Sequence, residues 1–198
     1  MRFDLTAPRT TWLAADTATG RPAIEDLKLV SSNTSLCTGA SMSYDSLVNR
    51  LYCFSSGTRT IRGYNLNADG SLPDSTPEVT WTFPDIYNQP EQTYQLQGAA
   101  VYHPANSATA NPCFVLHISG GESNPSKLYK FCPYTSTTTV TKISGALATN
   151  GEGVAITTDG MVWGIPEGAS KKMQAEGSSS IVLAPWVWGM PRSTIGVQ

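Results

Sequence analysis

The sequence has few charged residues and only two histidines. Charged side chains make up 14% of its 198 positions, and the formal net charge is −2. The 13 basic residues are scattered, and Lys171-Lys172 is the one adjacent basic pair. Because a nucleic-acid partner requires a stripe of Lys and Arg to neutralise phosphates, the sequence predicts that the protein does not bind nucleic acid.

Long apolar runs are also missing. No apolar stretch approaches the ~20 residues that span a bilayer. A secretory signal contains an apolar segment close to its N-terminus, and no such segment follows Met1-Arg2-Phe3-Asp4. We therefore expect a soluble protein that has no signal peptide and does not insert into a membrane. Such a protein can still work on a virion or on an extracellular surface after assembly.

The scarcity of histidine restricts catalytic chemistry. A Ser–His–Asp or Cys–His mechanism needs His103 or His117, and neither lies in a nucleophile motif such as Gly-x-Ser-x-Gly. No pair of acidic residues converges, and the cysteine spacings match no zinc pattern. We therefore expect no enzymatic activity, no metal and no cofactor, and we expect both histidines to be structural or surface residues.

The sequence does contain a unit that recurs about every fifty residues, a period typical of blades and solenoids. Each copy starts with glycine and a small apolar strand, passes through a turn-rich gap and reaches an aromatic-rich strand. The copies begin at Gly39, Gly98 and Gly153. Abundant Ser, Thr, Gly, Asn and Pro suit short strands joined by many turns.

The second and third units are each expected to form four antiparallel strands. These strands are predicted at 40–44, 50–55, 60–66 and 78–83, and at 99–103, 113–119, 127–134 and 137–143. The fourth and first units are less regular. Their candidate strands are 153–157, 161–165, 172–175 and 180–188, and 11–15 and 26–31.

Four antiparallel strands in about fifty residues is the plan of a propeller blade. We predict one all-β domain over residues 1–198, a propeller-like array of about four small antiparallel sheets. Its approximate units are 1–37, 38–94, 95–148 and 149–198. The alternative is a β-sandwich or irregular β-domain, in which the recurrence is only a rhythm of strands and turns.

One pair of cysteines is predicted to form a disulfide. If the second and third strands of the third unit form a hairpin, one apolar face is buried when Phe114 lies opposite Phe131. That register places Cys113 directly opposite Cys132, within reach of a disulfide at a non-hydrogen-bonded site. The bond requires an oxidising setting.

The other two cysteines are expected to be small buried thiols. In the hairpin that opens the second unit, Cys53 faces about Met42, which leaves Cys37 several residues out of register. Strand pairing therefore predicts no bridge between these two cysteines.

Four aromatic residues are candidates for binding. Trp186 and Trp188 project on one face if this segment is a strand. Exposed, they could stack on sugars or anchor a protein partner, and buried they are packing or subunit contacts. Tyr87 and Tyr94 belong to a loop region rich in Tyr, Asn and Gln, which mixes aromatic area with hydrogen-bonding groups. A solvated loop is the alternative there.

Two stretches resemble known propeller repeats. The stretch 49–72 resembles a repeat of the lactonase-type β-propellers, and 153–163 is similar to repeats of the gluconolactonase-like group. The resemblance implies a propeller fold and, as one alternative function, a lactonase-like hydrolase. Enzymes of that group hold a metal ion with acidic and Asn ligands at the central channel, and this sequence shows no matching ligand set.

The sequence as a whole predicts a structural or binding role without catalysis. A component of a larger assembly fits best, such as a virion tail or capsid accessory protein or an adhesin module. Its partners would be proteins, including copies of itself in a homo-oligomer. A lectin-like domain that binds a glycan is the second alternative.

Overall fold

The computed structural model describes most of the chain with gaps. The described residues are 2–4, 28–31, 37, 41–68, 71, 76–89, 92–105, 111–121, 124–134, 141–149, 151–166 and 187–197. The predicted strands at 11–15 and 172–175 lie outside this part of the chain, as does Trp186.

The described residues form antiparallel sheets, so the predicted all-β class is confirmed. The first sheet consists, in order, of β3 (Ser41–Asp45), β4 (Arg50–Ser55), β5 (Thr60–Asn65) and β6 (Val79–Thr82). The central sheet consists of β9 (Gln95–Tyr102), β10 (Cys113–Ser119), β11 (Pro125–Phe131) and β12 (Thr141–Thr149). In both, each strand pairs with the next one along the chain.

The remaining elements are smaller. The last sheet consists of β13 (Gly151–Ile156), β14 (Met161–Pro166) and β15 (Trp188–Pro191), and the 3-10 helix η1 (Arg192–Ile195) follows it. Two short pairs join β1 (Arg2–Asp4) to β2 (Lys28–Ser31) and β7 (Asn88–Gln89) to β8 (Gln92–Thr93).

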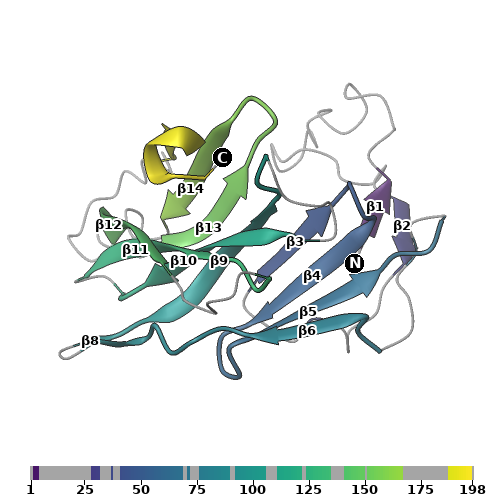
Figure 1. Cartoon of the computed structure of the whole chain (residues 1–198), viewed down its shortest axis with the longest axis horizontal. Helices are drawn as coiled ribbons and strands as arrows, with labels where there is room; N and C mark the ends of the chain where they lie inside the picture. Colours follow the sequence, from purple (N-terminus) through teal and green to yellow (C-terminus); the bar gives the residue numbers. More distant parts are fainter. Residues whose placement is uncertain are drawn as a thin grey trace, which may run out of the picture.

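The central sheet is covered on both faces. Every residue of β10 is buried, and its side chains alternate between two hydrophobic clusters. Phe114, Leu116 and Ile118 face the first sheet, whereas Cys113 and Val115 face the last sheet. The first and last sheets therefore flank the central one (Figure 1).

The first strands of neighbouring sheets lie side by side. β9 contacts both β3 and β13. Backbone N–H groups of β9 donate to serine side chains of β3, and we call this row of contacts the β3–β9 ladder. The Ala99 N–H donates to Ser41 Oγ and the Val101 N–H to Ser43 Oγ, each at 3.0 Å. Alternate residues of a strand point to one face, so the next β3 side chain directed toward β9 is Asp45. Its carboxylate accepts a hydrogen bond from His103 at 2.7 Å.

Several predicted strands match the structure. β4 and β10 have the predicted bounds, and β5 ends one residue earlier. The predicted pairing of Phe114 with Phe131, and of Met42 with Cys53, is also present. Residues 137–140 of the predicted fourth strand of the third unit lie outside the described residues, and β12 runs on to Thr149, beyond the predicted end at 143. The pairing of β12 with β11 is irregular at several points.

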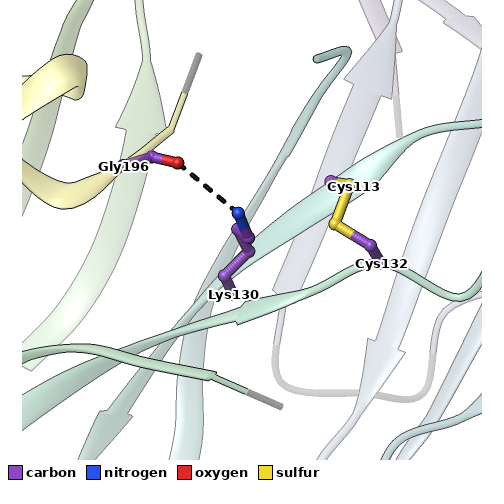
Figure 2. The surroundings of a disulfide bond; sticks show 4 residues. All are labelled: Cys113, Lys130, Cys132 and Gly196. Carbon is purple, nitrogen blue, oxygen red and sulfur yellow. Dashed lines mark hydrogen bonds between the residues drawn. A yellow bond between two sulfur atoms is a disulfide. The ribbon is translucent and has the colours of Figure 1, made fainter. Parts of the chain in front are cut away.

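The structure joins Cys113 to Cys132, with Cα atoms 4.3 Å apart, as the hairpin register predicted (Figure 2). Lys130 lies nearby on β11, and its ammonium donates a hydrogen bond of 3.5 Å to the Gly196 carbonyl (Figure 2). The disulfide and this contact both lie where β11 approaches the C-terminal turn.

The expectation of free thiols at Cys37 and Cys53 is wrong, because the structure joins these residues in a second disulfide. Cys53 faces Met42 as predicted. Cys37, however, precedes β3, so the register of the β3–β4 pair does not limit its position. It packs with Leu51 against Cys53 and Tyr64 on the outer face of the first sheet.

Candidate binding site

A pocket of about 300 Å³ lies at the turn between β4 and β5, and we call it the Arg59 pocket. Three segments of the chain build it: the β4–β5 turn, the segment after β6, and the start of β9. The lining residues are Ser56, Gly57, Arg59, Asp85, Tyr87, Tyr94 and Gln95. Both tyrosines predicted to bind from the sequence therefore lie at one place.

Arg59 and Asp85 place opposite charges in this pocket. The Arg59 Nη1 atom lies 3.9 Å from Asp85 Oδ2, and both side chains are more than a third exposed. At this exposure the pair contributes little to stability, since water screens it. A ligand in the pocket can therefore reach both side chains from the solvent.

Arg59 adopts a backbone conformation that is unusual for its residue type. Its φ is +54°, in the left-handed region that favours glycine and asparagine. The other described non-glycine residue with positive φ is Asn49, in the β3–β4 turn. The turn around Arg59 is held in place because the Phe83 N–H donates to the Arg59 carbonyl at 3.0 Å.

The rest of the pocket is held by hydrogen bonds from its own backbone. Oδ1 of Asp85 accepts from the Tyr87 N–H at 3.0 Å. The Tyr94 N–H donates to the Tyr87 carbonyl at 3.2 Å, and the Leu96 N–H donates to Ser56 Oγ at 3.3 Å. These bonds fix the three lining segments relative to one another.

The two tyrosines have different roles. Tyr94 is only 2% exposed, and the Lys127 ammonium lies 3.9 Å from the centre of its ring, so this ring forms a wall and offers no open stacking face. Tyr87 is partly buried, with its ring edge-on to Phe83. Burial raises the pKa of Tyr87.

Trp188 is partly buried and packs against the cluster between the central and last sheets. Its ring lies over Gly164, the residue opposite it on β14. On the other face of the sheet, Trp163 covers Gly189 in the same way. Each tryptophan thus shields the backbone of a glycine across the strand pair, and Trp188 does not offer an open face to a sugar.

Apart from Tyr134, which packs edge-on against Trp81, the large exposed apolar side chains of the described residues lie at the two ends of the stack of sheets. At one end, Met42, Tyr44 and Leu47 lie on and just after β3, and we call them the Met42 patch. At the other end, Trp163, Ile165 and Val187 form the Trp163 patch. Trp163 and Ile165 alternate with Val162 and so face away from the central sheet.

Both histidines take part in packing between sheets. His103 is held by Asp45, as described above. His117 is fully buried, and its Nδ1–H donates to the Gly153 carbonyl at 3.2 Å. Burial lowers the pKa of His117 to about 4, so the ring is neutral at pH 7.

No protein-family model and no curated protein matches the chain. Among the described residues, no three His, Cys, Asp or Glu side chains gather closely enough to hold a metal ion. The same part of the chain contains no helix of the length and apolarity that a membrane crossing requires.

Of the lining residues, only Tyr87 and Tyr94 were predicted from the sequence, and the charged pair Arg59 and Asp85 was missed. Arg59 follows Gly57-Thr58 in a tight turn, and Asp85 follows Pro84 in a segment that has no strand pattern. A turn and a loop show no periodicity that relates them to each other. The pairing of β5 with β6, and the bond from the Phe83 N–H to the Arg59 carbonyl, bring them together.

Proposed function

We propose that the chain is a non-enzymatic component of a larger assembly, in which copies of the chain dock head to tail. The observation that carries this proposal is the uneven covering of the three stacked sheets. The central sheet is buried on both faces, whereas the first and last sheets each expose an apolar patch. Exposed apolar area of this kind is typical of interaction sites.

The last sheet supports stacking as the mode of docking. Its inner face contributes Val154, Val162 and Met190 to the cluster shared with the central sheet. Its outer face presents Trp163 and Ile165 in the same alternation. A further sheet placed on this outer face would repeat the packing that the chain already uses twice within itself, as successive blades do in a propeller-like array.

The exposed side chains of the first sheet support a second copy of the chain as the partner that covers the Met42 patch. Met42 and Tyr44 occupy alternate positions on β3, opposite in direction to the side chains of the β3–β9 ladder. Farther across this face, Cys37 packs on Cys53 and Tyr64, so the exposed area is the β3 edge. The Met42 and Trp163 patches therefore lie at opposite ends of one stack, where a head-to-tail contact buries both.

Such a contact is heterologous, and it closes into a ring if the rotation between copies permits. A ring or stack of copies matches the role of a virion tail or capsid accessory protein, or of an adhesin module. Both histidines have structural roles in such an assembly. His103 binds Asp45 between two sheets, and His117 binds the Gly153 carbonyl. A lactonase-like activity is the less supported alternative.

Light scattering coupled to size exclusion tests the assembly. We expect the wild-type chain to form oligomers whose mass increases with concentration. Ile165→Asp or Tyr44→Asp is expected to weaken association at least tenfold, because a carboxylate cannot be buried in an apolar contact without a partner. Thr80→Asp, an exposed change on the outer face of β6, is the matched control and should leave the mass unchanged. A wild-type chain that stays monomeric at every concentration contradicts the proposal.

A further inference from the structure

We propose that the Arg59 pocket binds a neutral saccharide of one or two rings. This site is separate from both apolar patches, so it does not depend on the assembly. The pocket combines a guanidinium, a carboxylate, a hydroxyl and an amide, from Arg59, Asp85, Ser56 and Gln95. Donors and acceptors therefore alternate over a small area, and a sugar ring presents hydroxyl groups that both donate and accept.

The distance between Arg59 and Asp85 favours a hydroxyl between them. Their closest atoms are 3.9 Å apart, whereas a direct charge-assisted hydrogen bond between these groups is about 2.7–2.9 Å long. A sugar hydroxyl between them can donate to the Asp85 carboxylate and accept from the Arg59 guanidinium. Hydrogen bonds to charged groups are about twice as strong as neutral ones, so this contact provides orientation as well as affinity.

The same pair selects against charged ligands. An anion that approaches Arg59 also meets the Asp85 carboxylate, and a cation that approaches Asp85 meets the guanidinium. Repulsion from the nearer like charge lowers the affinity for either kind of ion. The formal charge of the pair is zero, which suits a neutral polyol.

The size and rigidity of the pocket limit the ligand to a small sugar. Its volume of about 300 Å³ is at the lower end of the range for ligand sites. Tyr87 supplies a partly exposed aromatic wall, although its hydroxyl group is buried. Because the backbone bonds of Tyr87, Tyr94 and Leu96 already fix the lining segments, little order is lost on binding.

Saturation-transfer NMR with defined sugars tests the site in the full-length chain. The neutral probes are glucose, galactose, mannose and N-acetylglucosamine, and the charged probes are sialic acid and glucosamine. We expect transfer to at least one neutral sugar at millimolar concentration and weaker transfer to both charged sugars. Transfer to none of the neutral sugars, or stronger transfer to a charged one, overturns the proposal.

Two substitutions and a matched control locate the binding. Asp85→Asn removes the charge but keeps the oxygen that accepts from Tyr87. Asp159→Asn is the control, because Asp159 accepts from the N–H two residues ahead in the same way, at Met161. Arg59→Asn removes the guanidinium and tolerates the positive φ of this position.

Asp85→Asn and Arg59→Asn are each expected to weaken sugar binding at least tenfold, whereas Asp159→Asn binds like the wild type. Near-ultraviolet circular dichroism checks that each variant is folded. Equal binding by all three variants contradicts the proposal. Repeating the titration on Ile165→Asp separates the two proposals, since this variant is expected to lose association and keep sugar binding.

Discussion

His103 donates a hydrogen bond from Nε2 to the Asp45 carboxylate across a distance of 2.7 Å, and this contact joins the first sheet to the central sheet. The Asp45 side chain is nearly fully buried, and its other oxygen accepts from the Leu47 N–H at 3.0 Å. The pair ends the ladder that begins with Ser41 and Ser43. It therefore holds two sheets in their stacked position.

Removing the charge from this pair is expected to destabilise the protein. Asp45→Asn keeps the acceptor for Leu47 but loses the charge-assisted bond, so the free energy of unfolding should fall by about 2 kcal/mol. Urea denaturation measures the change, and Asp159→Asn, at an exposed turn, should stay within about 0.5 kcal/mol of the wild type. Equal stability of the two variants would show that the contact does not hold the sheets together.

Trp188 over Gly164 gives a second stability test. A Cβ at Gly164 would clash with the Trp188 ring, whereas a Cβ at Gly153 meets nothing within 4 Å. Gly164→Ala is therefore expected to lower the free energy of unfolding by about 2 kcal/mol through overpacking. Gly153→Ala, on the neighbouring strand β13, is the control. Similar thermal midpoints for the two variants would contradict the close ring contact.

Because His117 is buried, we expect the protein to lose stability in acid. Its pKa in the folded protein, about 4, is below the value of about 6.5 in the unfolded chain. The unfolded state therefore binds more protons, and stability falls as the pH drops from about 6.5 to 4, by roughly 3 kcal/mol from this group. His117→Leu should flatten this part of the stability profile. A wild-type slope retained in the variant would assign the loss to other groups.

Loss of the disulfide between Cys113 and Cys132 is expected to lower the free energy of unfolding. It closes a loop with a sequence separation of 19, for which the loss of loop-closure entropy corresponds to about 3 kcal/mol. The paired change of both cysteines to Ala should lower the urea midpoint accordingly. Mass spectrometry under non-reducing conditions should show no free thiols at these two positions, and finding both reduced in oxidised protein would contradict the pairing.

Local pattern predicted the strands better than it predicted the contacts between sheets. β4 and β10 were predicted with their observed bounds because turn residues flank a short, aromatic-containing apolar run in each. The register of Phe114 with Phe131 followed from burying one face of a hairpin. These features depend on residues close together in the sequence, where period and turn chemistry are informative.

The contacts between sheets depend on how the sheets stack, which no local period encodes. Ser41 and Ala99 are 58 positions apart and meet only because β3 and β9 lie side by side. Cys37 reaches Cys53 from outside any strand pair. The Arg59 pocket likewise needs a turn and a loop from different segments. Its tyrosines were detectable by composition, but their separate roles, a buried wall and a partly exposed ring, were not.

The central claim is that the chain assembles head to tail through the Met42 and Trp163 patches. The most direct test mixes Tyr44→Asp with Ile165→Asp and measures the mass by light scattering. Each variant alone should be monomeric, and the mixture should form a dimer of one copy of each, since one intact patch on each copy remains to complete a single contact. A mixture that stays monomeric, or variants that still form oligomers alone, would contradict head-to-tail assembly.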